Sequence, residues 1–154
     1  MDVNYINPFI QASCSVLKSI ANFSSSLGQV YIKTSPYSSE SLAIVIGLIG
    51  DIKGHIVISM DRKVACKLAS RMMMGMPVER LDEISKSAIS EAANMILGNA
   101  ATILSSKNIK IDITPPALFE GENNLVSTPK MKTLCIPINI GGNEKIELDI
   151  ATLG

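Results

Sequence analysis

The sequence has no tryptophan and only one histidine, His55, among its 154 residues. Its three cysteines, Cys14, Cys66 and Cys135, are far apart in apolar or helical surroundings, so we expect buried free thiols. A zinc site needs clustered Cys, His or acidic ligands, and the sequence offers no such cluster. A Ser/His/Asp triad needs a histidine. His55, the only one, falls on the polar side of an alternating strand pattern. The composition therefore predicts neither a metal site nor a triad, and a solvated His55.

Excess charge of one sign and long apolar runs are also missing. Fourteen Lys and Arg balance fourteen Asp and Glu, and no dense basic cluster occurs, so nucleic acid is not an expected partner. The longest apolar run, 42–50, is far shorter than the ~20 residues of a membrane-spanning helix, and Asp2 stands where a signal peptide carries basic residues. We therefore expect a cytoplasmic protein with no membrane partner, folded as a single domain over residues 1–154.

The first half of the chain has the pattern of a helix, a strand and a hairpin. Apolar residues recur every three or four positions from 7 to 26, which predicts a helix. Alternation predicts a strand over 29–35 that stops at Pro36, followed by a polar loop over 37–40. A glycine-bounded turn at 50–54 joins two further strands into a hairpin.

The second half repeats that order after a connecting helix, which Asp61 caps and which runs to about Met74. The longest predicted helix extends from Asp82 to Ser106, and it is followed by a strand over 109–113 and a hairpin within 134–150. We therefore expect an internal helix, strand and hairpin repeat. The fold class is α/β of the layered α+β type: one antiparallel or mixed sheet, with hairpins at its centre and amphipathic helices packed on a face.

Apolar residues on the long helix predict which of its faces enters the core. Asn99 falls inside this apolar arc, which predicts a hydrogen-bonded core or interface amide. The methionine-rich run 72–76 is likewise expected to fill gaps in the core. The predicted arc consists of Ile84, Ala88, Ala92, Met95, Ile96, Ala100, Ile103 and Leu104.

A polar stripe follows the flank of the same helix. Ser87, Glu91, Asn94 and Gly98 occur at positions i, i+4, i+7 and i+11, and no Lys or Arg on the stripe neutralises Glu91. A carboxylate and an amide are therefore expected to point together toward solvent. The spacing alone favours an ordinary polar flank over a functional site.

The stripe and a later segment together resemble a family motif. Ser87-x3-Glu91-x2-Asn94, followed by Asp112-Ile113-Thr114-Pro115-Pro116, is similar to the signature of the CheC/CheX family of chemotaxis phosphatases. The similarity is greatest to its CheX-like members, whose order is also followed by residues 44–50, Gly54, 72–76 and 81–83. No role is assigned to Pro115 or Pro116.

The resemblance implies a CheC-like fold and hydrolysis of the aspartyl phosphate on a CheY-type response regulator. It implies that Asn94 positions the attacking water, that Glu91 pairs with a lysine of the regulator, and that Ser87 and Gly98 border the contact. A neutral amide can hold water in line without repelling the phosphoryl oxygens. No metal or cofactor belongs to the chain itself, since the Mg²⁺ ion is expected on the regulator.

The resemblance also implies a homodimer and one site per chain. The first helix offers Ser15-x3-Ser19-x2-Asn22, which keeps the spacing of the motif but has a serine in place of the glutamate. The alternative function is a non-enzymatic interaction module related to the domains of flagellar switch proteins.

Overall fold

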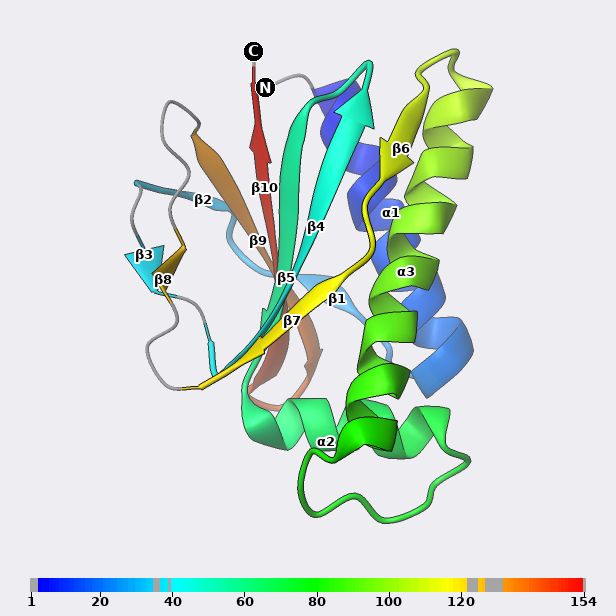
Figure 1. Ribbon diagram of the computed structural model, residues 1–154, viewed down its shortest axis with the longest axis vertical. Helices are drawn as coiled ribbons and strands as arrows, with labels where there is room; N and C mark the ends of the chain where they lie inside the picture. Colours follow the sequence, from blue (N-terminus) through cyan, green and yellow to red (C-terminus); the bar gives the residue numbers. More distant parts are fainter. Residues whose placement is uncertain (1–2, 35–36, 39, 122–124, 127–131, 154) are drawn as a thin grey trace.

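Two long helices cover one face of a central antiparallel sheet, and a shorter helix lies across their lower ends, in the computed structural model (Figure 1), which describes residues 3–34, 37–38, 40–121, 125–126 and 132–153. The helices are α1 (Val3–Ala21), α2 (Arg62–Met72) and α3 (Glu83–Ser106). The strands are β1 (Ser26–Leu27), β2 (Tyr31–Lys33), β3 (Tyr37–Ser38), β4 (Leu42–Gly50), β5 (Gly54–Met60), β6 (Ile111–Ile113), β7 (Ala117–Glu120), β8 (Leu125–Val126), β9 (Thr133–Gly141) and β10 (Glu144–Thr152).

The sheet confirms the predicted internal repeat and the central hairpins. Its strand order is β1-β9-β10-β5-β4-β6, with β2 also on β9 and β7 also on β4. The two hairpins meet where β10 pairs with β5, and Ile150 lies opposite Ile56 there. Each half places its short strands on the hairpin of the other half, so neither half can complete the sheet alone.

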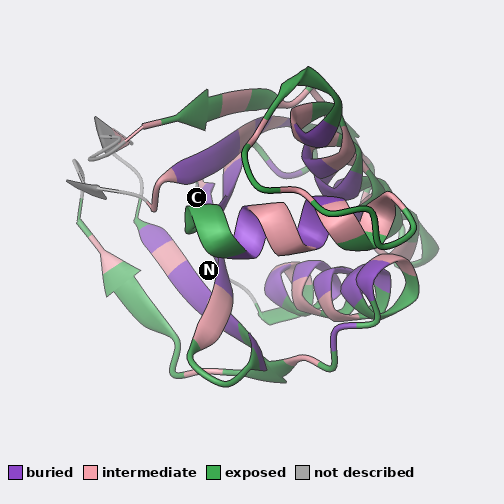
Figure 2. Ribbon diagram, turned by 90° about the horizontal axis from the view of Figure 1, so that it is seen from below, coloured by how far each residue is buried: buried purple, intermediate pink, exposed green. Residues whose placement is uncertain are grey.

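The core lies between the sheet and the helices, as the buried residues in Figure 2 show. Alternate residues of β4, such as Ile44, Ile46 and Leu48, face it and are buried. α1 packs along α3 on the same side of the sheet. None of the helices in the described ranges is long and apolar enough to cross a membrane.

Both helices that follow α1 begin at the predicted aspartates. Asp61 accepts a hydrogen bond from the Val64 backbone N–H at 2.8 Å. Asp82 and Ser85 form a capping box, in which each side chain accepts the backbone N–H of the other at 2.8 Å. These bonds fix where α3 starts and hence which of its residues face outward.

The first helix differs from its prediction at both ends, since it runs from Val3 to Ala21 and not over 7–26. Asn22 ends it with a positive φ of 56°, and the Phe23 N–H donates to the Leu17 carbonyl at 3.2 Å. This left-handed cap is available to asparagine at little cost. α3 ends in the same way at Asn108, with φ 62°.

Several local predictions need correction. The strand predicted over 29–35 is β2, which spans only Tyr31–Lys33. Residues 37–38 form β3 against β8, where a loop was expected. Ser35, Pro36 and residue 39 lie outside the described residues. The strand β7 was not predicted, because Ala117-Leu118-Phe119-Glu120 shows no clear alternation.

Two side-chain predictions were also wrong. The methionine-rich run contacts the core only at its start: Met72, the last residue of α2, packs against the core, but the chain then leaves it, and Met74 and Met76 are exposed. His55 is half-buried and its Nε2 is shielded from solvent, and burial lowers its pKa. All three cysteines are free as predicted, but only Cys135 is buried, while Cys14 and Cys66 are half-buried.

Candidate active site

The buried face of α3 is rotated from the predicted arc. Ile84, Met95 and Asn99 are exposed, so a core position for Asn99 is wrong, while an interface position with another molecule stays a prediction. The reason is that α3 contacts both the sheet and α1, and the two neighbours bury a face that includes positions missed by the arc. The buried residues are Ser85, Ile89, Ala92, Ala93, Ile96, Leu97, Ala100 and Leu104.

This rotation leaves the polar stripe at the surface. Ser87, Glu91 and Gly98 are exposed and Asn94 is half-buried. Ser87, Glu91 and Asn94 line one open cleft of about 570 Å³, whereas Gly98 lies outside that lining. The structure thus brings together three of the four predicted residues.

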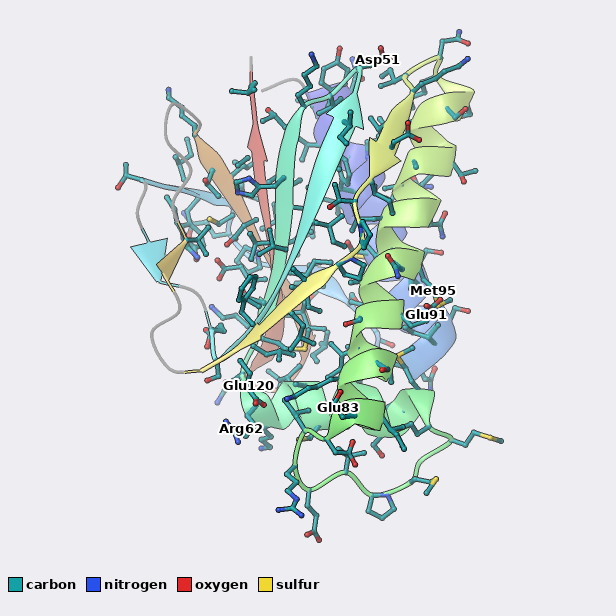
Figure 3. All side chains as sticks on the ribbon, in the orientation of Figure 1. Asp51, Arg62, Glu83, Glu91, Met95 and Glu120 are labelled. Atoms are coloured by element: carbon teal, nitrogen blue, oxygen red, sulfur yellow. The ribbon has the colours of Figure 1, made fainter. Side chains whose placement is uncertain are left out.

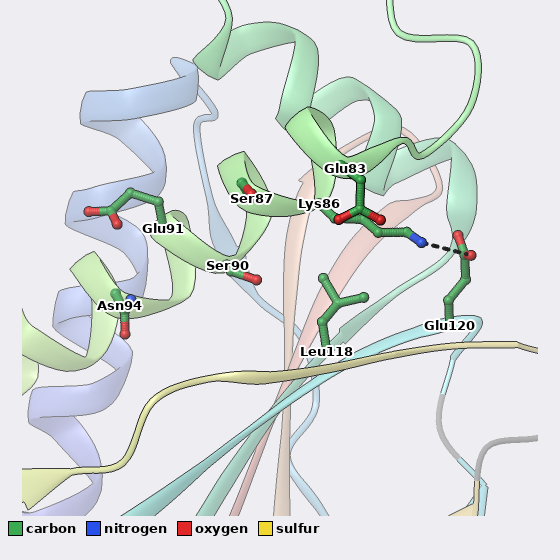
Figure 4. A pocket seen from close by; sticks show the side chains of 8 residues that line it. All are labelled: Glu83, Lys86, Ser87, Ser90, Glu91, Asn94, Leu118 and Glu120. Atoms are coloured by element: carbon green, nitrogen blue, oxygen red, sulfur yellow. Dashed lines mark ion pairs between the residues drawn. The ribbon is translucent and has the colours of Figure 1, made fainter.

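The cleft lies between α3 and β7, as Figure 4 shows. An ion pair joins its two walls, because Lys86 Nζ on α3 lies 3.6 Å from Glu120 Oε1 on β7. Glu83, Ser90 and Leu118 complete the lining. The sequence patterns missed these five residues because the β7 strand was not predicted and because Lys86, Glu83 and Ser90 lie outside the motif.

β7 is held in place through its contacts with β4. Leu118 pairs with Ile44 in the antiparallel register. Just before β7, the Thr114 N–H donates to the Gly47 carbonyl at 3.0 Å, and the Gly47 N–H donates to Thr114 Oγ1 at 2.8 Å. A Cβ added at Gly47 would lie 2.9 Å from Thr114 Cγ2, so glycine permits this close approach. The motif segment at Thr114 therefore positions the far wall of the cleft.

Glu91 and Asn94 are not engaged by the fold. Among the described residues, no cation lies within ion-pair distance of the Glu91 carboxylate, and the Asn94 amide has no side-chain hydrogen bond. A carboxylate and an amide are thus available, side by side, to a molecule that approaches α3.

The lining residues limit the chemistry of the cleft. They include serines but no histidine or cysteine that could activate a nucleophile. They offer carboxylates, an amide and hydroxyls, which bind cations and orient water. Such a surface suits a reaction whose reactive group is brought by a partner.

A separate group of potential metal ligands lies on the face of the sheet that points away from the helices, although the composition predicted no cluster of Cys, His or acidic ligands. Ligand atoms of Cys135, Glu147 and Asp149 lie within 4.8 Å of one another, and all three residues are buried. Lys33 Nζ hydrogen-bonds to Glu147 and lies 3.5 Å from Asp149. The lysine ammonium therefore already supplies a cation to this cluster.

The cluster has strongly shifted pKa values. Burial, and then the neighbouring Glu147, raise the pKa of Asp149 to about 7. Burial alone would raise the pKa of Glu147 as well, but hydrogen bonds from Asp149 and Lys33 hold it below its usual value. Burial and the hydrogen bond to Glu147 raise the pKa of Tyr31 to about 12.

The sequence profile of the family described as chemotaxis phosphatase CheX matches residues 42–139, which include the motif on α3 and the segment at Thr114. The chain belongs to the CheX family. The CheC-like fold implied by the motif is also confirmed, because a CheC-like superfamily protein from Shewanella sp. PV-4 superimposes with a TM-score of 0.89, 25% identity and full coverage of both chains.

Two further relatives match nearly the whole chain. The CheY-P phosphatase CheX of Thermotoga maritima is 29% identical over 151 residues, which is 98% of this chain and 97% of that protein. The crystal structure of a CheX-CheY-BeF3-Mg²⁺ complex from Borrelia burgdorferi matches with 30% identity and a TM-score of 0.82, covering 99% of this chain and 100% of that one.

Proposed function

We propose that this protein hydrolyses the aspartyl phosphate of a CheY-type response regulator. The observation that carries the proposal is the pair Glu91 and Asn94, which project together beside an open cleft and have no partners among the described residues. The family and the two relatives named for CheY support this substrate.

In this proposal Asn94 positions the attacking water. An acyl phosphate is already reactive, so the main requirement is a water held in line with the phosphorus atom. The Asn94 amide can both donate and accept hydrogen bonds, and it carries no charge that would repel the phosphoryl oxygens. Its half-buried position on a regular helix limits its rotamers and thus supports a positioning role.

Glu91 orients the complex by pairing with a lysine of the regulator. An exposed ion pair contributes only ~0.2 to 1 kcal/mol, but a pair that docking removes from water can contribute more. Ser87, one turn earlier, borders the contact.

Gly98 allows the partner backbone to approach α3. A Cβ added there would meet no neighbouring atom within 4 Å, so packing within the chain does not require glycine. Glycine in a helix interior costs about 1 kcal/mol relative to alanine. Its presence is therefore explained by contact with another molecule.

In this proposal the protein has no cofactor of its own, and the Mg²⁺ ion belongs to the phosphorylated regulator. It acts as one domain over residues 1–154 in the cytoplasm, where such regulators signal. Support for one domain comes from the core cluster of the described residues, to which both halves contribute.

We also propose a homodimer that forms through the sheet. The edge of the sheet at β1 and β2 exposes the apolar residues Leu27, Val30 and Ile32, which a second copy could cover. Sedimentation at micromolar concentration should give twice the 16.5 kDa chain mass, and a monomer alone would contradict this.

The phosphatase proposal is tested with the regulators of the same organism. Each is phosphorylated on its receiver aspartate, and the lifetime of the phosphoryl group is measured with and without a catalytic amount of the protein. A shortened lifetime supports the proposal. Binding to the phosphorylated regulator with an unchanged lifetime would instead favour the interaction module.

A further inference from the structure

Two apolar side chains, Ile84 and Met95, are exposed next to Glu91 on the surface of α3. Ile84 is 66% exposed and Met95 is 38% exposed. They lie seven residues before and four residues after Glu91, so the three side chains fall within about 40° of one another around the helix. Figure 3 shows Met95 beside Glu91 on the side of α3 that points away from the sheet.

The fold itself does not require these side chains at the surface. The core position next to Met95 is filled by Ile96, and Ile89 fills the one near the start of the helix. The corresponding exposed positions of α1, beyond its first residue, are all polar: Asn4, Asn7, Gln11, Ser15, Lys18 and Ser19. Exposed apolar groups are therefore a particular feature of the helix that carries the site.

We propose that Ile84 and Met95 are the apolar anchors by which α3 docks the response regulator, one on each side of Glu91. This inference rests on the proposed function, and the occupant is the regulator because the anchors adjoin Glu91, the residue proposed to pair with the regulator. Their separation of eleven residues is about 16 Å along the helix. That span fits within an ordinary protein interface of about 800 Å² per partner.

The anchors give the Glu91 contact its strength. Apolar contacts around an ion pair exclude water, and the attraction between two charges rises when water is removed. Methionine suits this position because its flexible side chain adapts to an uneven surface. Glu91 would then contribute orientation, while the apolar pair contributes most of the affinity.

The test uses alanine variants at exposed positions, which should fold normally. Met95→Ala and Ile84→Ala are compared with wild type for KM and kcat on the phosphorylated regulator, and for Kd with the beryllofluoride-activated regulator. We expect KM and Kd to rise by about tenfold for each variant, with kcat within about twofold. Met95→Leu should restore most of the affinity. Met74→Ala, which removes an exposed methionine from the loop before α3, is the matched control and should behave as wild type.

The possible outcomes distinguish a failure of the anchors from a failure of the proposed phosphatase function. If wild type hydrolyses the phosphate and both alanine variants keep its KM and Kd, the anchors are wrong and the function stands. A fall in kcat at unchanged KM would also overturn a docking role. If wild type binds without hydrolysis, the phosphatase proposal fails, and a loss of binding in Met95→Ala still supports the anchors. If wild type neither binds nor hydrolyses, both are refuted.

Discussion

The two halves of the chain build the same unit, yet only α3 displays a carboxylate beside an amide. α1 contains no Asp or Glu at all, and its exposed residues after the first are neutral polar groups and one lysine. Asn22, which the spacing of the motif placed on a stripe of α1, caps the end of that helix with φ 56°. α3 exposes Glu91 and Gly98 with Asn94 at their flank.

This difference shows that the fold and the site depend on separate sets of residues. The sheet, the core and the asparagine caps recur in both halves and need only buried apolar residues and turns. The site needs a few exposed side chains that the fold leaves without partners. A repeat can therefore lose a site without losing its place in the structure.

The largest expected effect comes from reversing the charge at the site. Glu91→Lys places a cation where a lysine of the regulator is expected, and like charges at an interface cost several kcal/mol. Dephosphorylation at subsaturating regulator should fall by about 100-fold or more. Gln11→Lys puts the same charge on the exposed face of α1 and should leave the rate near that of wild type. Equal losses in the two variants would show that net charge, and not the site, is responsible.

The second expected effect concerns the buried carboxyl groups that the β9–β10 hairpin carries and the β4–β5 hairpin lacks. β10 carries Glu147 and Asp149, whereas the positions opposite them on β5 are Ser59 and Val57. The pKa of Asp149 is raised to about 7, so the folded protein binds a proton that the unfolded chain releases near pH 4. The contribution of Asp149 to stability is therefore present at low pH and is lost as the pH rises toward and through 7.

Asp149→Asn removes this proton uptake. Between pH 5 and pH 8 the free energy of unfolding of wild type should fall, relative to that of the variant, by on the order of 2 kcal/mol. Urea unfolding at several pH values gives the difference. His55, whose pKa is lowered, has the opposite pH slope in both proteins and cancels in the comparison. Parallel pH profiles would contradict a raised pKa at Asp149.

Asn22→Ala tests whether Asn22 only caps α1 or also acts like the amide proposed for catalysis, Asn94. Alanine is disfavoured at positive φ, so the variant should lose about 1 to 2 kcal/mol of stability, while its kcat stays near that of wild type. Asn22→Gly, which tolerates the left-handed region, should recover most of the loss. Thermal unfolding measures both. A loss of kcat without a loss of stability would mean that α1 carries a second site.

The smallest expected effect is at Gly98. Gly98→Ala should raise the free energy of unfolding by about 0.5 to 1 kcal/mol, because alanine favours the helix and meets no neighbour within 4 Å. The same variant should bind the activated regulator more weakly. Stabilisation with unchanged binding of the regulator would show that Gly98 is not part of the contact.

The repeat, the central hairpins and the outward position of the α3 stripe could be predicted from the sequence, because each rests on local periodicity and on caps such as Asp82. The far wall of the cleft could not, since β7 is defined by its pairing with β4 and not by its own pattern. The exposure of Met95 and Asn99 also depends on where α1 packs, which periodicity does not report. The Lys33, Glu147 and Asp149 cluster joins residues more than a hundred positions apart.

The central claim is that Asn94 acts in turnover and not in folding or binding. The most direct test measures kcat of Asn94→Ala at saturating phosphorylated regulator, together with its Kd for the beryllofluoride-activated regulator. Removing one preorganised polar group from a transition state typically costs about 3 kcal/mol, so kcat should fall by about 100-fold while Kd changes little. A wild-type kcat in this variant would contradict the proposed role of Asn94.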